Sequence, residues 1–385
     1  MKKIAVLLIV ALFAGGGMMA GISHEATQEM ASKPMAAPET QSHTFSFSSP
    51  EITRGDWLQI DVDGCTTLSH EGEPMLPVTM HTMTFPLGTN IQEVQVTVGD
   101  VETRSLTTKV APAAKPMPLN MQSAELVQEP GPVYDSNELY PSEWLRWHTG
   151  AGLDYGEHVT FLSLQAFPAR YAPQANVLRS VQSIDVTVTY EPPSQPMLTA
   201  DTYDLVIVTP QEFSEALQPL VQHKEDHGVA TKLVTLGEVY SGDHFAVEGR
   251  DDPEQIKYFI KNALEDWGIS YVMLVGGRNG GFMQEKWWCP VRYSHLDDNS
   301  DEEKYLSDLY FADVYKQDGD DVVFASWDEN ENGVYAEWTM TGKEILDMYP
   351  DVAVGRLACR NSYEVTQMVE KIITYETTAA GSDWA

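Results

Sequence analysis

The sequence predicts two folded parts in succession: a β-sandwich over residues 43–192 and an α/β part with a mainly parallel sheet over residues 203–385. Three observations support this prediction. The first part alternates apolar and polar residues over short segments that Gly, Pro and Asn interrupt. The second part alternates short apolar strands with stretches of helical period. Between them, the proline-rich segment EPPSQPMLTA predicts an exposed linker at 193–202, a place where proteases cut.

The first part is expected to be β-structure throughout because no long stretch in it holds a helical period. Strands are predicted at Trp57–Val62, Val94–Val98, Val159–Leu164 and Ile184–Tyr190. Many short strands separated by frequent turns are typical of a β-sandwich. Residues 23–42 precede this part, are rich in Ala, Ser, Pro and Thr, and are expected to form a flexible spacer.

The second part is expected to alternate strands and helices, which implies a parallel sheet with right-handed crossovers. The predicted strands are Asp204–Val208, Val229–Leu236, Tyr271–Val275 and Asp351–Val354. Each helix has a start signal: a capping box with an early proline at Thr209–Glu212, the same pattern at Asp252–Gln255, and Asn361 followed by Glu364. These helices are expected to end near Gly228, Trp267 and Thr377.

The charge balance excludes two kinds of partner. The chain has 57 acidic and 24 basic residues and a formal net charge of −33. Such a surface repels nucleic acid and anionic membranes, so neither is expected to bind. The excess acid either serves as a solvated surface or is partly grouped to bind divalent cations. No zinc motif and no phosphate-binding glycine loop occurs, so neither a zinc site nor a nucleotide cofactor is expected.

The N-terminus has the pattern of an export signal. Lys2 and Lys3 precede an apolar core at Ile4–Ala14, and the segment is expected to extend to residue 22. An uncleaved membrane anchor is the alternative, since the apolar run continues to Ile22. No later segment could span a bilayer. The expected location is therefore secreted, either extracellular or at the cell surface.

The cysteines do not form a disulfide framework. There are three, Cys65, Cys289 and Cys359, and each lies in or beside apolar sequence, where a buried role is expected. Cys289 lies six residues before His295, but neighbouring tryptophans and a proline favour burial over catalysis. Cys359 is next to Arg360, which could lower its pKa, but it follows a core strand. We therefore assign no catalytic residue in this chain.

The segment Asp328–Gly333 fits the D-x-N-x-N-G opening of a calcium loop. The predicted ligands are Asp328, Asn330, Asn332, the backbone oxygen of Val334, and Glu337. Position twelve of the loop is Thr339 rather than Glu, so this is not an EF-hand. The alternative is a hairpin turn between β-like segments at Val322–Trp327 and Val334–Trp338.

Several stretches resemble the gingipain family of cysteine peptidases. They are YDLVIVT (203–209), YVMLVGG (271–277), SDLYFADVY (307–315), YPDVAVGRLACRN (349–361) and KIITYE (371–376). Their order and spacing carry the resemblance. The first part, with GEPMLPV (72–78) and IDVTVTYEP (184–192), is similar to that family's β-rich prodomain.

The resemblance implies a prodomain at 43–192 and, from residue 203, the first half of a caspase-like peptidase domain. It also implies that the catalytic His and Cys lie in a second half, so the chain as given is expected to be inactive. Asp308 matches the aspartate that lies at the base of the substrate pocket in Arg-cleaving members. The alternative is that Ser307 and Asp308 only begin a strand or cap a turn. Gly277 and Arg278 stand where the family has an acidic residue, which weakens that assignment.

Two functions follow from this reading. One is a secreted cysteine endopeptidase precursor that acts on peptide or protein substrates once a second half completes it, with its own prodomain as a partner. The other is a non-catalytic secreted binding protein, stabilised by calcium and derived from the peptidase. Calcium is the one cofactor expected, supported by family members that bind it.

Overall fold

The computed structural model describes residues 36–115, 127–280, 286–295, 304–319, 321–337 and 343–378. Residues 34–385 form one compact unit. The predicted export signal lies outside the described residues. Among the helices that are described, none is both long and apolar enough to cross a bilayer.

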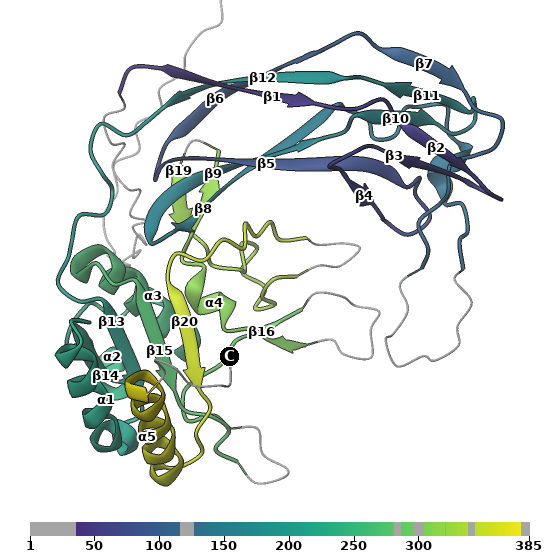
Figure 1. Cartoon of the computed structure of the whole chain (residues 1–385). Helices are drawn as coiled ribbons and strands as arrows, with labels where there is room; N and C mark the ends of the chain where they lie inside the picture. Colours follow the sequence, from purple (N-terminus) through teal and green to yellow (C-terminus); the bar gives the residue numbers. More distant parts are fainter. Residues whose placement is uncertain are drawn as a thin grey trace, which may run out of the picture. The chain divides into compact units, whose positions relative to one another are not determined.

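Two antiparallel sheets of the β-rich part pack face to face (Figure 1). One has the order β1-β12-β6, formed by Glu39–Ser46, Ser183–Glu191 and Asn90–Val98. The other has the order β4-β5-β9-β8, formed by Thr66–Leu68, Leu76–Pro86, Glu157–Ala166 and Leu145–Asp154. Buried residues from both sheets form one apolar cluster that includes Phe45, Phe85, Leu164 and Val186. The predicted β-sandwich is therefore confirmed.

Shorter elements complete the β-rich part. They are a hairpin of β2 (Glu51–Arg54) and β3 (Leu58–Asp61), a sheet of β10 (Ala169–Ala172), β11 (Val177–Ser180) and β7 (Glu102–Ser105), and the 3₁₀ turn η1 (Pro132–Asp135). All four strands predicted in this part are present. The spacer predicted at residues 23–42 extends too far, because strand β1 already begins at Glu39, which pairs with Tyr190 of β12. Backbone hydrogen bonding to a neighbouring strand outweighs the polar composition of these residues.

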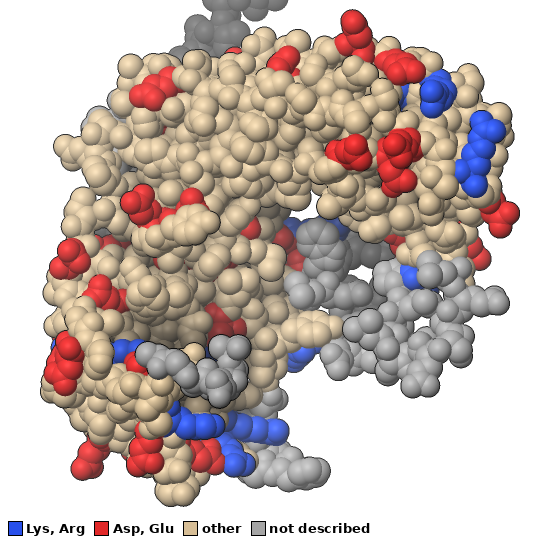
Figure 2. All heavy atoms as spheres, in the orientation of Figure 1, with Lys and Arg blue, Asp and Glu red and all other residues tan. Residues whose placement is uncertain are grey.

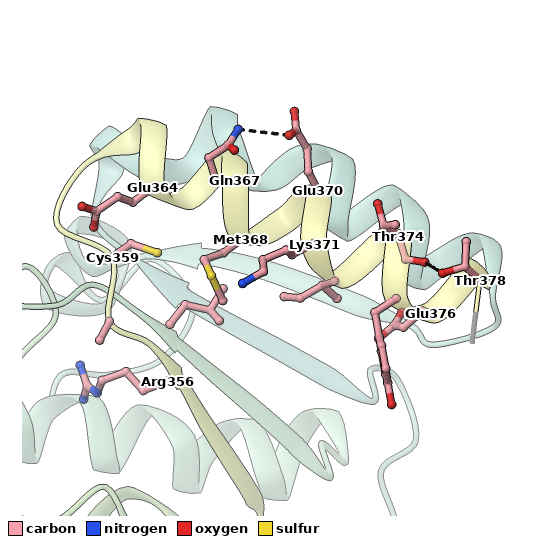
Figure 3. A pocket seen from close by; sticks show the side chains of 14 residues that line it. Arg356, Cys359, Glu364, Gln367, Met368, Glu370, Lys371, Thr374, Glu376 and Thr378 are labelled. Atoms are coloured by element: carbon pink, nitrogen blue, oxygen red, sulfur yellow. Dashed lines mark hydrogen bonds between the residues drawn. The ribbon is translucent and has the colours of Figure 1, made fainter. Parts of the chain in front are cut away.

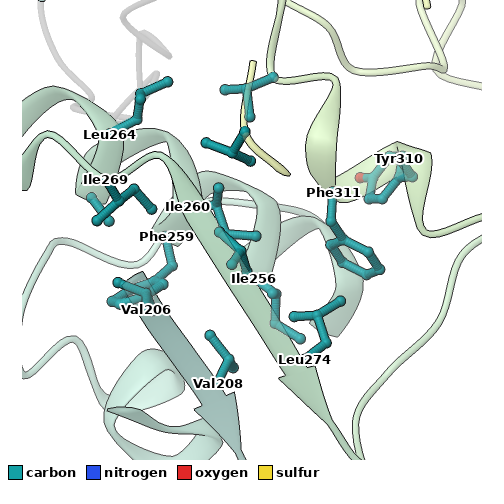
Figure 4. Packing of buried hydrophobic residues seen from close by; sticks show 14 of the residues in the cluster. Val206, Val208, Ile256, Phe259, Ile260, Leu264, Ile269, Leu274, Tyr310 and Phe311 are labelled. Carbon is teal, nitrogen blue, oxygen red and sulfur yellow. The ribbon is translucent and has the colours of Figure 1, made fainter. Parts of the chain in front are cut away.

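The second part is built on a parallel sheet of order β14-β13-β15-β20, as predicted. Its strands are Thr231–Thr235, Leu205–Thr209, Tyr271–Val275 and Ala353–Leu357. Alternate residues of β13 point to opposite faces, because successive side chains of a strand do so. Val206 and Val208 join a cluster with helix α3 (Asp252–Trp267), and Figure 4 shows this packing. Leu205 and Ile207 join a second cluster on the other face.

That second face is covered by α1 (Ser214–Asp226) and α5 (Ser362–Thr378), which contact each other along their length. Fully apolar strands such as β13 are expected where a parallel sheet is covered on both sides. The α/β fold class is therefore confirmed.

The predicted helix start signals are confirmed in part. Asn361 accepts a hydrogen bond from the backbone N–H of Glu364 at 3.0 Å, so α5 is capped as predicted. The capping box at Thr209 does not form, because strand pairing continues through Thr209 and a 3₁₀ turn, η2 (Gln211–Phe213), precedes α1. A capping box forms instead at Thr235 and opens the short helix α2 (Leu236–Ser241), which was not predicted.

Between β15 and β20 the chain forms short elements. They are β16 (Tyr293–Ser294), β17 (Tyr305–Leu306), α4 (Leu309–Ala312), β18 (Tyr315–Asp318) and β19 (Asp321–Phe324). The alternative to a calcium loop was a hairpin between Val322–Trp327 and Val334–Trp338, of which Trp338 lies outside the described residues. One backbone hydrogen bond, from Ala336 to the oxygen of Trp327 at 2.6 Å, joins the two segments, but no strand pairing between them is present among the described residues. Strand β19 pairs backwards with β18, with Asp318 opposite Asp321. This local turn needs less chain closure than the predicted one.

Strand β20 lies at the edge of the parallel sheet, and within the described residues its outer side pairs with no strand. Unpaired edge strands favour association, and a lysine on the edge opposes it. We therefore expect residues 1–385 to self-associate as concentration rises, and Gly355→Lys, which enters open space, to reduce this. Analytical ultracentrifugation measures the effect. Gln218→Lys on the exposed face of helix α1, away from any sheet edge, adds the same charge as a control. A wild-type monomer at all concentrations would contradict the prediction.

Candidate functional site

Arg356 of β20 holds together the loops at the carboxyl ends of the parallel strands. Its guanidinium donates to both carboxylate oxygens of Asp308, at 2.7 and 2.8 Å. It also donates to the backbone oxygens of Gly276, Cys289 and Pro290 at 3.0–3.1 Å. Burial acts to lower the pKa of Arg356, but the hydrogen bonds to Asp308 outweigh it and the pKa is raised. In α/β sheets this end is where ligand-binding loops gather.

The predicted pocket residue Asp308 lies at this position, directly before α4. Its carboxylate is engaged in two parallel hydrogen bonds by the internal Arg356, the geometry of a strong ion pair. Its side chain keeps 32% exposure, so the ion pair is only partly shielded from solvent. Binding of a substrate guanidinium there stays a prediction. Any such substrate would share the carboxylate with Arg356.

The cysteines lack the features of an activated nucleophile. Cys289 is fully buried, and burial raises the pKa of its thiol to about 11, although the adjacent Arg356 acts in the opposite direction. Burial also raises the pKa of Cys359. Reactive thiols need a lowered pKa. The predicted burial of these two residues is observed, whereas Cys65 is only half-buried.

An open groove of about 1310 Å³ lies between the end of β20 and helix α5. Figure 3 shows Cys359, Met368 and Lys371 between the helix and the sheet. The groove reaches Arg356, so it adjoins the Asp308 ion pair. Apolar atoms form most of its surface. The groove lies beside the end of β20, the edge strand of the parallel sheet.

The predicted calcium loop forms a tight, hydrogen-bonded turn. The Asp328 carboxylate accepts the backbone N–H groups of Asn332 and Gly333 at 2.9 and 3.0 Å. The side-chain amide of Asn332 donates to Glu337 at 2.8 Å. Gly333 has a φ of +79°, the left-handed conformation that the turn requires. Asn330 accepts the backbone N–H of Asn332 at 3.0 Å, and Asn332 accepts that of Val334 at 2.7 Å, so all five predicted ligands lie around one turn.

A protein cation competes for this loop. Arg250 donates to the Asp328 carboxylate at 2.7 Å and is also paired with Glu254. Within the described residues, no group of three or more His, Cys, Asp or Glu side chains is placed to hold a metal ion. The oxygen donors suit calcium chemically. Asp328 would have to exchange or share Arg250 to bind it.

A network of buried charge that the sequence analysis missed lies beneath α4. Lys257 of α3 is fully buried among the rings of Tyr310, Phe324 and Trp327, with its ammonium 4.3 Å from the Tyr310 centroid. Burial lowers the pKa of Lys257 to about 7. Its position relative to Ile260 and Leu264 was a usable signal, because this i, i+3, i+7 spacing lies on the apolar face of α3.

Asp313 and Asp351 are the carboxyl groups whose charges act most strongly to raise the pKa of Lys257, against the effect of burial. Both are fully buried. Burial raises the pKa of Asp313 to about 7, and it raises the pKa of Asp351 well above its ordinary value. Asp351 accepts the N–H groups of Val314 and Tyr315, each at 2.7 Å. It thereby joins the segment before β20 to the segment after α4.

The fold and this site define a class of protein: a β-sandwich followed by a parallel α/β half whose loops converge at one sheet end. Comparison with known families agrees. The family described as Peptidase family C25 matches residues 198–385, and Propeptide_C25 matches residues 33–213. The chain belongs to this family, the gingipain family of cysteine peptidases, and consists of its prodomain followed by a half of its catalytic domain.

Three solved structures from Porphyromonas gingivalis are similar. The complex of RgpB pro- and mature domains is 16% identical, covers 40% of this chain and 83% of that chain, and has a TM-score of 0.33. The structure on zymogenic latency of gingipain K is 18% identical, covers 41% of this chain and 94% of that chain, and has a TM-score of 0.32. Dimeric latent PorU is 13% identical, with coverage of 92% and 39% and a TM-score of 0.33. The chain thus spans 39% of the PorU chain. No curated protein matches.

The ion pair at the sheet end gives a stability prediction. Asp308→Asn leaves the Arg356 guanidinium with weaker partners, which is expected to lower the free energy of unfolding by about 1–3 kcal/mol. Denaturant unfolding measures the loss, and Asp321→Asn on exposed β19 is the matched control. Combining Asp308→Asn with Arg356→Met should cost less than the sum of the two single changes. Strict additivity would show that the pair does not couple these loops.

Proposed function

We propose that this chain is the front portion of a secreted cysteine endopeptidase zymogen, in which the β-sandwich prodomain docks on the first half of the catalytic domain. The observation that carries the proposal is the match of prodomain and peptidase families to consecutive parts of one chain. The substrates are peptides or proteins. Export rests on the N-terminal signal pattern, which also supports an extracellular or cell-surface location.

The chemistry supports inactivity of residues 1–385 alone. A thiolate nucleophile needs a nearby base and a stabilised oxyanion. Cys289 is buried with a raised pKa, and Cys359 likewise. Peptide cleavage therefore depends on a nucleophile and a base outside this chain, as the resemblance to gingipains implies. Asp308 and Arg356 would lie at the substrate-facing end of the sheet and set the position of the pocket loops.

The alternative function is a secreted binding protein derived from the peptidase. The apolar groove beside α5 favours it, because such a surface could receive a partner. Acidic side chains are scattered over the visible face rather than gathered in one patch (Figure 2). The sequence of the gene beyond codon 385 separates the two functions.

An activity assay tests the peptidase proposal. Purified residues 1–385 should not hydrolyse Arg or Lys peptides, whereas a product of the extended reading frame should, and a thiol-directed inhibitor should label a cysteine outside residues 1–385. Cys289→Ala in the extended protein should leave activity unchanged. If 1–385 alone cleaves peptides and Cys289→Ala abolishes this, the proposal is wrong. A stop codon directly after residue 385 would favour the binding protein.

We also propose that the loop from Asp328 to Glu337 binds calcium. Its oxygen donors and the left-handed Gly333 support this. Asp328, Asn330, Asn332, Glu337 and the backbone oxygen of Val334 would hold the ion, which would stabilise the turn. Catalysis is not expected to involve it.

Removal of calcium tests this site. Chelation should lower the melting temperature, and Asn332→Ala should abolish the calcium-dependent part of the stability. Terbium luminescence, sensitised by the adjacent buried Trp327, reports binding directly. Arg250→Gln should tighten binding, because it removes the competing cation from Asp328. Equal stability with and without calcium, together with no terbium signal, would refute the proposal.

A further inference from the structure

The segment 193–202, which joins the two parts between β12 and β13 (Figure 1), is held unevenly along its length. Ser194–Pro196 is a run of exposed residues. Met197 and Leu198, which follow directly, are half-buried and pack against the core cluster of α3 and the parallel sheet. The Met197 sulfur fills the space beside Gly88, where a Cβ would collide with it. The chain is therefore anchored from Met197 onwards.

Backbone contacts extend this anchor to the start of the α/β half. The N–H groups of Thr202 and Tyr203 both donate to the backbone oxygen of Trp267, at 2.7 and 3.1 Å. The backbone oxygen of Ala200 lies against Gly268, a close approach that a side chain at this glycine would prevent. Cleavage within the stretch 197–203 would first require these contacts to open.

The chain is also anchored on the prodomain side. The backbone oxygen of Pro192 accepts the N–H of Ala36 at 2.9 Å. Between the two anchors, Ser194–Pro196 has no hydrogen-bond or ion-pair partner among the described residues. Proteases cut preferentially in exposed stretches of small and polar residues, where few contacts oppose local opening. The structure thus confines the accessible part of the junction to three residues.

Proline narrows the choice of bond further. Most endopeptidases do not cut before proline, whose ring fixes φ and whose nitrogen carries no N–H. This disfavours the bond between Gln195 and Pro196. The bond between Ser194 and Gln195 is the one in this stretch that joins two exposed residues of which neither is proline.

The junction contains no basic residue. No Lys or Arg occurs in residues 180–223. The preceding one, Arg179, lies in β11, which pairs with β10 on one side and with β7 on the other. The following one, Lys224, lies in helix α1 and is paired with Glu376. A peptidase that cuts after Arg or Lys therefore finds no bond in the linker, and the nearest candidates lie in regular structure.

We propose that the bond between Ser194 and Gln195 is the processing site at which the prodomain is separated, and that the protease which cuts it accepts a small uncharged residue rather than Arg or Lys. Hydrolysis adds one water molecule: the C–N bond breaks, Ser194 gains a carboxylate and Gln195 gains a free amino group. The role of this cut in maturation rests on the proposed zymogen function. A completed enzyme with the specificity that Asp308 predicts would not make the cut itself.

The position of the cut leaves the α/β half intact. The new N-terminus, Gln195, lies two residues before the Met197 anchor. The contacts of Thr202 and Tyr203 with Trp267 remain, so strand β13 keeps its start and its pairing.

Trypsin variants of residues 1–385 test accessibility. Ser194→Arg turns the bond to Gln195 into a trypsin site, and Thr199→Arg does the same for the bond to Ala200, in the anchored stretch. Both original side chains are exposed, so the two variants differ in how firmly the backbone is held. Under native conditions we expect trypsin to cut Ser194→Arg at least about tenfold faster than Thr199→Arg, because the anchored stretch must open first. Mass spectrometry of the fragments measures both rates.

A third variant tests the anchor itself. Adding Met197→Ser to Thr199→Arg should raise the rate of cleavage after residue 199 toward that of Ser194→Arg, because it removes the side chain that packs beside Gly88. Circular dichroism confirms that each variant is folded. Brief treatment of the unmodified chain with subtilisin, which does not require a basic residue, should give its first cut in the junction at Ser194–Gln195.

The natural secreted protein tests the processing role. Mass spectrometry of its N-terminal peptide should find Gln195 as the first residue of the catalytic part. Equal trypsin rates for Ser194→Arg and Thr199→Arg, a first subtilisin cut within 197–203, or a natural N-terminus elsewhere would overturn the inference. These results concern one bond and leave the zymogen proposal standing. Absence of peptidase activity in the product of the extended reading frame would instead contradict the zymogen proposal.

Discussion

Burial of carboxyl groups is the constraint on which the α/β half depends. Asp313 and Asp351 have no exposed surface, and described residues between β15 and β20 supply partners for one carboxylate oxygen of each. Asp351 accepts two backbone amides from the residues after α4, and the indole of Trp327 donates to Asp313. The aromatic rings around Lys257 hold a cation at the same place. Removing any one partner would leave buried charge uncompensated.

Arg356 plays the corresponding part at the other end of β20. It joins Asp308 and three backbone oxygens, so the strand that starts beside the carboxyl network ends at the candidate substrate site. The two sites are thus ends of one five-residue strand, Ala353–Leu357. A shift of that strand would be felt at both.

Much of this fold could be predicted because its signals are local. The apolar spacing of α3 and the Asn361 cap depend on residues within one or two turns, and both predictions were confirmed. Thr209 has an equally good capping pattern, yet pairing with Thr235 of β14 keeps it in a strand. Tertiary hydrogen bonds decide such positions, and a single sequence does not contain them.

The candidate site was less predictable for the same reason. Similarity to gingipains located Asp308, but its partner Arg356 lies 48 residues further along the chain. Composition gave no reason to join them. The calcium pattern at Asp328 was equally visible in sequence, whereas the competing Arg250 lies 78 residues earlier.

The glycines of β8 allow a segment of the α/β half to pack closely against the β-sandwich. Gly150 and Gly152 weaken an isolated edge strand, because glycine loses more backbone entropy on ordering and has no side chain to pack. In this position they let Tyr349 approach the strand, and the stacking on Phe161 and the two edge hydrogen bonds offset that loss. The strand therefore has its full stability only when the catalytic half is docked. The segment that covers this edge meets it through the Asp347 carboxylate, which accepts the N–H of Ala151, and through the backbone oxygen of Pro350, which accepts that of Leu153.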